Sequence, residues 1–359
     1  MHVLHVVGAR PNFMKAAPVL RALKSYPDVR QTLVHTGQHY DRAMSDVFFE
    51  QLGVPDPDVN LAVGSGSHAR QTAAIMERFE PVLLEKRPDW VLVYGDVNST
   101  IAAALVCSKL GFRIAHVEAG LRSFDRTMPE EINRLLTDQI ADLLLTPSSD
   151  GNENLRNEGI PAERVHLVGN VMIDTLVRLL PIAEAKSEEL MQRLGVTRFG
   201  LVTLHRPATV DSPEVLLPIL TVLNEISRDL PIVFPIHPRT RAQLGERING
   251  FSGSLKIIEP LPYIDFLSLQ KHATVVITDS GGIQEETTFL GTQCLTVRDS
   301  TERPVTVTLG TNQVIGRDPH NLKHAVGKLL DGNRKKGEVP PLWDGHASER
   351  IAAILCTCH

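Results

Sequence analysis

The sequence predicts an α/β fold with two doubly wound domains, each built on a parallel sheet covered by helices. Two observations predict this fold. Short runs rich in β-branched residues alternate with longer helical patterns along all 359 residues. Polar side chains gather where the strand runs end, which is where open α/β sheets bind their ligands. At this length, either half can bury its own core.

The strands expected in the first half are short apolar runs at 2–7, 31–35, 91–94, 113–117, 143–146 and 165–168. Those expected in the second half lie at 201–204, 232–236, 256–259, 274–278, 293–297 and 313–315. Because helical segments separate consecutive strands, we expect parallel sheets with right-handed crossovers. The two domains facing each other would enclose the polar strand ends in one cleft.

The domain boundary is expected near Gly169-Asn170, where one strand ends and a helix over 172–185 begins. The first domain then spans 1–169 and the second 170–345. The stretch 346–355 is helix-like, and we expect 346–359 to pack back against the first domain.

Composition argues against several classes of protein. The net charge of -5 gives no electrostatic reason to expect nucleic acid as a partner. No apolar run approaches the roughly 20 residues that cross a bilayer, and the first residues are more typical of a strand than of a signal peptide. These features predict a cytoplasmic enzyme.

The cysteines are scattered and predict no disulfide framework; they are Cys107, Cys294, Cys356 and Cys358. The last two, together with His359, could bind a metal, but an exposed tail is the simpler interpretation.

The segment DSGGIQEE, residues 279–286, is the most informative in the chain. A buried strand runs into Ser280, Gly281 and Gly282, and a helix is expected to begin there. The free N–H groups and positive dipole end of a helix start bind phosphate. Glu286 falls about one turn further on, where a carboxylate suits the two hydroxyls of a ribose. The segment therefore predicts a site for a nucleoside diphosphate.

Three carboxylates in the first half predict acid–base chemistry. Asp96 and Glu118 close two strands, and Glu130 follows a proline at the expected start of a helix. Carboxylates brought together push their pKa values apart, which separates an acid from a base. Asp96 could instead cap a helix, and Glu130 could compensate a helix dipole. Three basic residues near the same strand ends favour catalysis: Arg10, Lys15 and Arg134.

Two histidines of the second half, His205 and His237, each end a strand beside an arginine and a proline. A single histidine is more often structural, but the proposed diphosphate site at neighbouring strand ends favours binding or catalysis. The sequence has no close spacing of His, Asp and Glu of the kind that would indicate a metal site. No GxGxxG follows the first strand, so a nicotinamide site is poorly supported.

Eight segments in chain order carry a resemblance to a known family: GARPNFMKAAPV, TGQHYD, VYGDVNST, AHVEAGLRSFDRTMPEEINRLLTDQ, TLHRP, PIHPR, TDSGGIQEE and RDSTERPV. They resemble the non-hydrolysing UDP-N-acetylglucosamine 2-epimerases. The resemblance implies two Rossmann-like domains of the GT-B type with a cleft between them, usually in a homodimer. It also implies reversible interconversion of UDP-N-acetylglucosamine and UDP-N-acetylmannosamine, without a cofactor or an essential metal, for cell-wall or surface polysaccharide biosynthesis.

By motif position, the resemblance implies roles for individual residues. The catalytic set is Asp96, Glu118, Glu130 and His205. The substrate-binding set is Arg10, Lys15, Arg134, Ser280, Gly281, Gly282 and Glu286. Gln38, His39, Arg206 and His237 match positions where bacterial relatives bind a second UDP-N-acetylglucosamine as an activator. Which carboxylate is the base and which the acid stays open.

The chain departs from the common pattern of the family at Asn12, where many members have a glutamate.

Three alternatives also stay open. The same chemistry could act on a modified sugar such as UDP-2,3-diacetamido-glucuronate. A GT-B glycosyltransferase would need an acceptor groove and only one base. A sugar-nucleotide sensor without activity would not need the acids.

Overall fold

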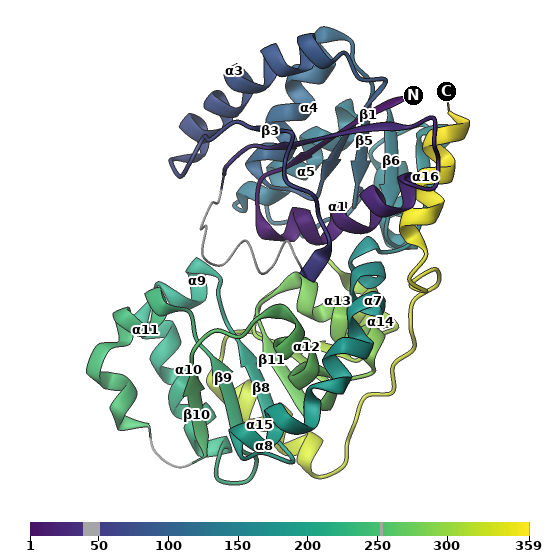
Figure 1. The fold of residues 1–359 in the computed structure, drawn as a ribbon. Coiled ribbons are helices and arrows are strands. Elements are labelled where there is room, and N and C mark those ends of the chain that lie inside the picture. Colours follow the sequence, from purple (N-terminus) through teal and green to yellow (C-terminus); the bar gives the residue numbers. More distant parts are fainter. Residues whose placement is uncertain (39–50, 252–253, 359) are drawn as a thin grey trace. The chain divides into compact units, whose positions relative to one another are not determined.

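The computed structural model describes residues 1–38, 51–251 and 254–358 (Figure 1). The chain divides into two compact units, Met1–Thr175 with Pro341–His359, and Leu176–Pro340. We call them unit 1 and unit 2. The boundaries expected from the sequence, after residues 169 and 345, stand a few residues from these divisions. Among the described residues, no helix has both the length and the apolar content needed to cross a membrane.

Unit 1 is built on a parallel sheet with the strand order β3-β2-β1-β4-β5-β6-β7 in the described residues. The strands are β1 (His2–Val7), β2 (Arg30–His35), β3 (Val59–Asn60), β4 (Trp90–Tyr94), β5 (Ile114–Val117), β6 (Leu143–Thr146) and β7 (Val165–Leu167). Every residue of β1, β4, β5 and β6 is buried. Continuous burial is expected because helices cover both faces of such a sheet.

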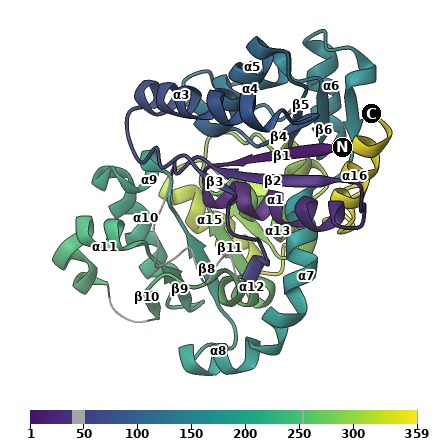
Figure 2. The same cartoon turned by 45° about the horizontal axis from the view of Figure 1, so that its top comes forward.

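The helices of unit 1 follow these strands in turn. They are α1 (Arg10–Leu23), α3 (His68–Lys86), α4 (Asn98–Leu110), α5 (Pro129–Ile140), α6 (Ser149–Asn157) and α16 (Ala347–Thr357), and α7 (Val171–Ala185) runs on into unit 2. The N-terminus and α16 lie on the same side of unit 1 (Figure 2).

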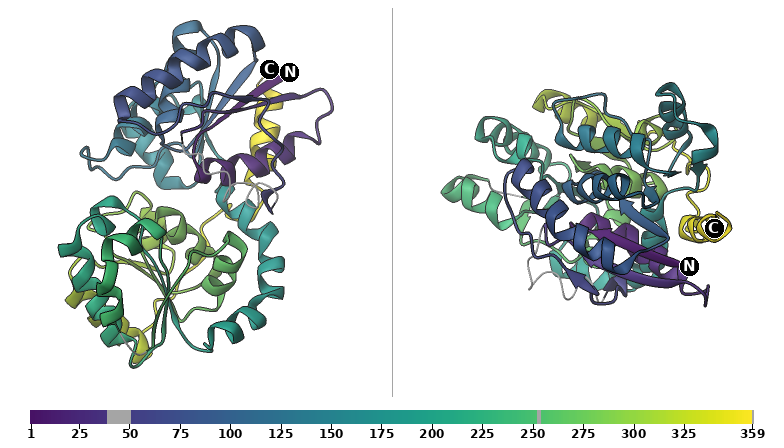
Figure 3. Two further views of the ribbon diagram at one scale, coloured as in Figure 1. Left: turned by 60° about the vertical axis from the view of Figure 1, so that its left-hand side comes forward. Right: turned by 90° about the horizontal axis from the view of Figure 1, so that it is seen from above.

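Unit 2 repeats the design, a sheet with helices around it (Figure 3). Its strand order is β10-β9-β8-β11-β12-β13 in the described residues. Its strands are β8 (Gly200–Thr203), β9 (Ile232–Pro235), β10 (Leu255–Ile258), β11 (Val275–Thr278), β12 (Cys294–Thr296) and β13 (Asn312–Val314). Its helices are α8 (Ser187–Leu194), α9 (Pro207–Val210), α10 (Pro213–Ile226), α11 (Pro238–Leu244), α12 (Tyr263–His272), α13 (Gly281–Leu290), α14 (Pro304–Thr308) and α15 (Pro319–Leu330). An apolar core lies between the sheet and α10 and α15.

The predicted fold class is confirmed, with two parallel, doubly wound sheets. Every strand expected from the sequence is present, and most ends agree within one residue. The strand β3 was not expected, because its two residues pair only with the end of β2 and one of them is exposed. The cysteines are free thiols.

The last helix, α16, packs against α1 and is anchored by a buried carboxylate. Asp174 on α7 accepts hydrogen bonds from the backbone N–H groups of Ala347 (3.1 Å) and Ser348 (2.7 Å). These groups belong to the first turn of α16, which has no partner for them within the helix. Burial raises the pKa of Asp174, so its ionised form depends on these bonds.

We therefore expect Asp174→Ala to lower the free energy of unfolding of the protein by about 1–2 kcal/mol, as does the loss of other helix caps. The matched control is Asp174→Asn, which keeps one acceptor oxygen and should lose less. Thermal and urea unfolding followed by circular dichroism measure both. Equal stability of the wild type and the alanine variant would contradict the anchoring role.

Candidate active site

The carboxyl ends of β1, β4 and β5 meet at one edge of the sheet of unit 1 because the strands are parallel. Lys15, on α1 after β1, places its Nζ atom 2.7 Å from Oε1 of Glu118, which follows β5. Both residues are about 6% exposed, so the ion pair is largely shielded from water. The ion pair therefore joins the helix that follows β1 to the loop that follows β5.

Gly95, which directly follows β4, lies beside this ion pair. A Cβ atom at this position would stand 2.7 Å from Nζ of Lys15 and 3.7 Å from Oε1 of Glu118. The residue also has a positive φ of 62°, which glycine adopts without strain. The absence of a side chain here leaves room for the ion pair.

Glu118 itself has a φ of 76°, in the left-handed region. Residues other than glycine rarely adopt this backbone conformation, which costs them roughly 1–2 kcal/mol. Strained backbone of this kind clusters at functional sites. The N–H group of Glu118 donates to the carbonyl of Leu145 (3.0 Å), which holds the strained residue against β6.

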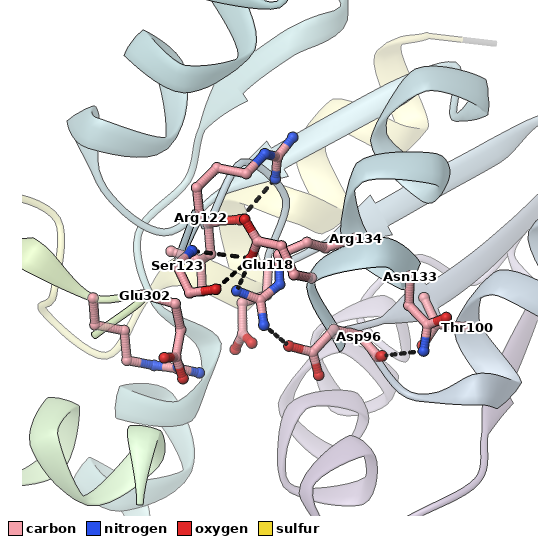
Figure 4. A network of polar contacts seen from close by, with 12 residues as sticks. Asp96, Thr100, Glu118, Arg122, Ser123, Asn133, Arg134 and Glu302 are labelled. Carbon is pink, nitrogen blue, oxygen red and sulfur yellow. Dashed lines mark hydrogen bonds and ion pairs between the residues drawn. The ribbon is translucent and has the colours of Figure 1, made fainter. Parts of the chain in front are cut away.

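Asp96 forms an ion pair with Arg134 of α5, with Nη2 and Oδ2 2.7 Å apart (Figure 4). Its carbonyl oxygen accepts a hydrogen bond from Asn133 on the same helix (2.8 Å). The alternative role of Asp96 as a helix cap is not found, because Val97 occupies the N-cap position of α4. The acid is instead held from the side by α5.

Glu130 and Glu131 both lie in the first turn of α5, but their surroundings differ. Glu131 is 1% exposed and accepts bonds from the N–H and Oγ of Ser123 and from the N–H of Phe124. It also lies 3.0 Å from Arg134. Glu131 therefore fastens the loop after β5 to α5, a role that no sequence motif suggested.

Glu130 and Asp96 line the same cavity, which has a volume of about 250 Å³. Its lining also includes polar side chains and two apolar ones, namely Gln38, Ser65, His68, Gln71, Asn98 and Asn133, with Val97 and Pro129. Gln38 accepts hydrogen bonds from the N–H (3.1 Å) and Oγ (2.7 Å) of Ser99. The structure therefore places Gln38 beside two predicted acids, whereas its neighbour His39 lies outside the described residues.

Two further residues of α1 complete this edge. Arg10 is the first residue of the helix and is exposed. Asn12 is buried; its Oδ1 accepts from the N–H groups of Gly8 (3.1 Å) and Ala9 (3.0 Å), and its Nδ2 donates to the carbonyl of Tyr94 (2.8 Å). The residue that departs from the common pattern thus holds the turn after β1 against β4.

In unit 2, the buried carboxylate of Asp279 joins the ends of β8 and β11. It accepts hydrogen bonds from the backbone N–H groups of His205 (3.1 Å) and Arg206 (3.0 Å). Nδ1 of His205 also lies 3.3 Å from Oδ1 of Asp279, while the ring itself is exposed. His237 follows β9 and is exposed as well.

The helix α13 begins at Gly281 with Ser280 as its N-cap, followed by Gly282. A Cβ atom at Gly281 would stand 2.3 Å from Nη1 of Arg303, so glycine is required for the guanidinium to approach. Arg303 pairs with Glu285 (2.9 Å) and with Glu302. The predicted phosphate-binding helix start is thus present and has an arginine packed against it.

Glu302 collects three guanidinium groups, those of Arg206, Arg298 and Arg303. Although burial opposes its ionisation, these groups hold the pKa of Glu302 well below its usual range. With Glu285 and Asp279 included, three guanidinium groups face three carboxylates. These ion pairs lie close to the start of α13.

Glu286 is 2% exposed and lies in the second turn of α13. Burial raises its pKa from 4.5 to about 7, although a hydrogen bond from the hydroxyl of Tyr263 (2.8 Å) acts in the opposite direction.

Among the described residues, no cluster of three or more His, Cys, Asp and Glu is arranged to hold a metal.

Comparisons with known proteins show which family this chain resembles. The family model described as UDP-N-acetylglucosamine 2-epimerase matches residues 21–356. A UDP-N-acetylglucosamine 2-epimerase of Methanococcus maripaludis is 44% identical over 360 residues, which are 98% of this chain and 97% of that protein. A UDP-2,3-diacetamido-2,3-dideoxy-D-glucuronate 2-epimerase of Pseudomonas aeruginosa is 42% identical over 369 residues, 99% of each.

The crystal structure of the Methanocaldococcus jannaschii UDP-GlcNAc 2-epimerase in complex with UDP-GlcNAc and UDP matches with a TM-score of 0.91 and 42% identity. The match covers 99% of this chain and 100% of that one. It confirms the predicted fold class, two Rossmann-like domains of the GT-B type. From the family model and these relatives together, the chain belongs to the UDP-N-acetylglucosamine 2-epimerase family, a family of isomerases.

Proposed function

We propose that this protein interconverts UDP-N-acetylglucosamine and UDP-N-acetylmannosamine. The observation that carries the proposal is the convergence of three carboxylates in unit 1. Asp96 and Glu130 line one cavity, and Glu118 joins the same sheet edge through Gly95. Membership of the epimerase family and the ligands of the M. jannaschii structure support the choice of substrate.

The chemistry requires more than one carboxylate. Carbon 2 of the sugar has no neighbouring carbonyl, so its proton is hard to remove. Cleavage of the bond between carbon 1 and the diphosphate oxygen releases UDP with the electron pair and leaves an oxocarbenium-like centre. A carboxylate then takes the proton from carbon 2, and 2-acetamidoglucal forms. Re-addition of UDP with a proton delivered to the opposite face of carbon 2 completes the inversion.

The ion pairs of unit 1 suit this use of the acids. Arg134 holds Asp96, and Lys15 holds Glu118, so both carboxylates are oriented before the sugar arrives. Preorganised groups of this kind lower the barrier because they need no rearrangement during the reaction. We assign Asp96, Glu118 and Glu130 to the proton transfers.

The nucleotide half of the substrate is assigned mainly to unit 2. Ser280, Gly281 and Gly282 form a helix start that suits the diphosphate, and Glu286 suits the ribose. We assign the departing diphosphate also to Arg10, Lys15 and His205, and we assign Arg134 to substrate binding. The exposed ring of His205, held by Asp279, is free to face a ligand, so we place it in the catalytic set.

A second molecule of UDP-N-acetylglucosamine is proposed as an activator, bound by Gln38, His39, Arg206 and His237. Further expectations rest on the resemblance alone. They are a homodimer, a cytoplasmic location, and a role in cell-wall or surface polysaccharide biosynthesis.

The second candidate is epimerisation of a diacetamido-glucuronate, since the P. aeruginosa relative is nearly as similar as the archaeal one. The lining of the cavity argues for the uncharged sugar. Its described residues include two carboxylates, Asp96 and Glu130, and no lysine or arginine that could balance a sugar carboxylate.

Incubation of the protein with UDP-N-acetylglucosamine in heavy water should yield the manno epimer with deuterium at carbon 2, as read by NMR. The same incubation with UDP-2,3-diacetamido-glucuronate should turn over more slowly, by about tenfold or more. The reason is that the carboxylate of its sugar would be buried without a positive charge to balance it. A faster reaction of the glucuronate would favour the second candidate. Absence of deuterium in any product would exclude both.

Asp96→Asn, Glu118→Gln and Glu130→Gln should each lower kcat by on the order of 10² or more, as expected for lost general acids and bases. The affinity for UDP, measured by calorimetry, should stay near the wild-type value. Glu153→Gln, on the exposed surface of α6, is the matched control. Near-normal turnover of the three acid variants would show that the assignment is wrong.

The pKa of Glu286 predicts that UDP binding depends on pH. An ionised carboxylate accepts bonds from both ribose hydroxyls, so affinity for UDP should rise as the pH increases through about 7. Glu286→Gln should weaken binding and remove this dependence. Calorimetric titrations at several pH values measure both, and a wild-type affinity that falls over this range would contradict the assignment.

The free energy of unfolding should fall as the pH increases, whereas the affinity for UDP should rise. Between about pH 4.5 and 7 the folded protein holds the proton of Glu286 that the unfolded chain has released. The group therefore lowers stability as the pH rises through this window, and the penalty is complete above it. Glu286→Gln should accordingly gain more in Tm over the wild type at about pH 8 than at about pH 5.

A further inference from the structure

A buried histidine of unit 1 contacts the residue that precedes Asp96 and takes no part in the assignments above. His116 is the third residue of β5 and is 0% exposed. Its Nδ1 atom lies 2.6 Å from Oδ1 of Asp138 on α5, and its Nε2 atom lies 2.8 Å from the carbonyl oxygen of Gly95. Both nitrogens of the ring are thus in contact with oxygen atoms.

Neither oxygen can donate a proton. The carbonyl of Gly95 only accepts, so Nε2 must carry hydrogen. Oδ2 of Asp138 lies 2.7 Å from Nη1 of Arg122 and accepts the N–H of Gly120 (3.1 Å). Burial opposes the ionisation of Asp138, but the positive charge of Arg122 favours it independently of His116. An ionised carboxylate also only accepts, so Nδ1 must carry hydrogen as well.

The charges of the cluster lead to the same conclusion. Arg122 also donates to both oxygens of Glu158, at 2.7 and 2.6 Å. With His116 protonated, two positive groups face two carboxylates. With His116 neutral, this nearly buried cluster would hold an unbalanced negative charge, which is costly away from water.

The two ends of the cluster reach the backbone beside two catalytic candidates. Gly95 directly precedes Asp96, and its missing side chain makes room for the pair of Lys15 and Glu118. On the other side, Asp138 binds the N–H of Gly120, two residues after Glu118. One charged unit therefore holds the loops that present both acids.

We propose that His116 is a positioning residue that donates from both ring nitrogens and, with Asp138, sets the places of Asp96 and Glu118. The proposal deepens the proposed function and rests on it for its effect on turnover. The protonation of the ring itself does not depend on any activity.

The same sheet provides a matched control. His5 on β1 is also 0% exposed. Its Nδ1 atom lies 2.7 Å from the hydroxyl of Tyr94 and its Nε2 atom 3.2 Å from Oε1 of Gln31. Because the hydroxyl can donate, a neutral ring satisfies both contacts. Burial lowers the pKa of His5 to about 3, so we expect this ring to stay neutral.

The first test is NMR of the full chain with its histidine rings labelled with ¹⁵N. His116→Gln and His5→Gln identify the two sets of signals. His116 should show protons on both ring nitrogens near neutral pH, whereas His5 should show one. A single ring proton at His116 near neutral pH would overturn the proposal.

The second test separates positioning from simple stabilisation. His116→Asn keeps a donor towards Asp138 but loses the contact with Gly95, and His116→Gln does the reverse. The asparagine variant should lose kcat by on the order of 10², the effect of a misplaced catalytic group, with KM changed by less than about threefold. The glutamine variant, which still holds Gly95, should lose less.

His5→Gln should lower Tm but keep the kcat of the folded protein. A folded His116→Asn variant with wild-type kcat would show that His116 only stabilises the fold, and the proposal would fail. If the wild-type protein shows no epimerisation, the proposed function fails instead, and the NMR result still decides the protonation of the ring.

Discussion

The candidate active site depends on a single residue without a side chain, Gly95. The ion pair between Lys15 and Glu118 occupies the space where its Cβ would be. Its carbonyl binds His116, and Asp96 follows it directly. A larger residue would require Nζ of Lys15 to move and would be strained by the positive φ at this position. Because β1, β4 and β5 are parallel, these groups come from distant parts of the chain and still meet at one edge.

Much of this architecture could be predicted from the sequence. Apolar runs bounded by glycine and polar residues located the strands, because strands covered on both faces are apolar throughout. The ends of those runs then located Asp96 and Glu118, since parallel strands bring their carboxyl ends together. The helix start at Ser280 followed from the glycines after β11.

Other parts could not be predicted, because they depend on partners far apart in the chain. Glu131 and Glu130 are adjacent acids in the same turn, and only the packing of the loop around Ser123 distinguishes their roles. The pair of His116 and Asp138 spans 22 positions. The strained backbone of Glu118 and the raised pKa of Glu286 likewise arise from tertiary contacts. Sequence patterns report local preferences, so such contacts leave no signal in them.

The two units contribute different kinds of electrostatics. Unit 1 pairs each of two carboxylates with one positively charged side chain: Asp96 pairs with Arg134, and Glu118 pairs with Lys15. These ion pairs orient the carboxylates for proton transfer. Unit 2 places three guanidinium groups around Glu302 near the start of α13, and the free N–H groups of that helix start suit an anion. The proposed reaction needs both environments, because it moves a proton and releases a diphosphate.

The central claim is that the bond between carbon 1 and the diphosphate breaks during each turnover. It is tested most directly with UDP-N-acetylglucosamine that carries ¹⁸O in the bridging position between carbon 1 and phosphorus. If UDP is released and recaptured, the label should move into the non-bridging oxygens of the same phosphate in recovered substrate. A label that stays in the bridge while epimerisation proceeds would contradict the account.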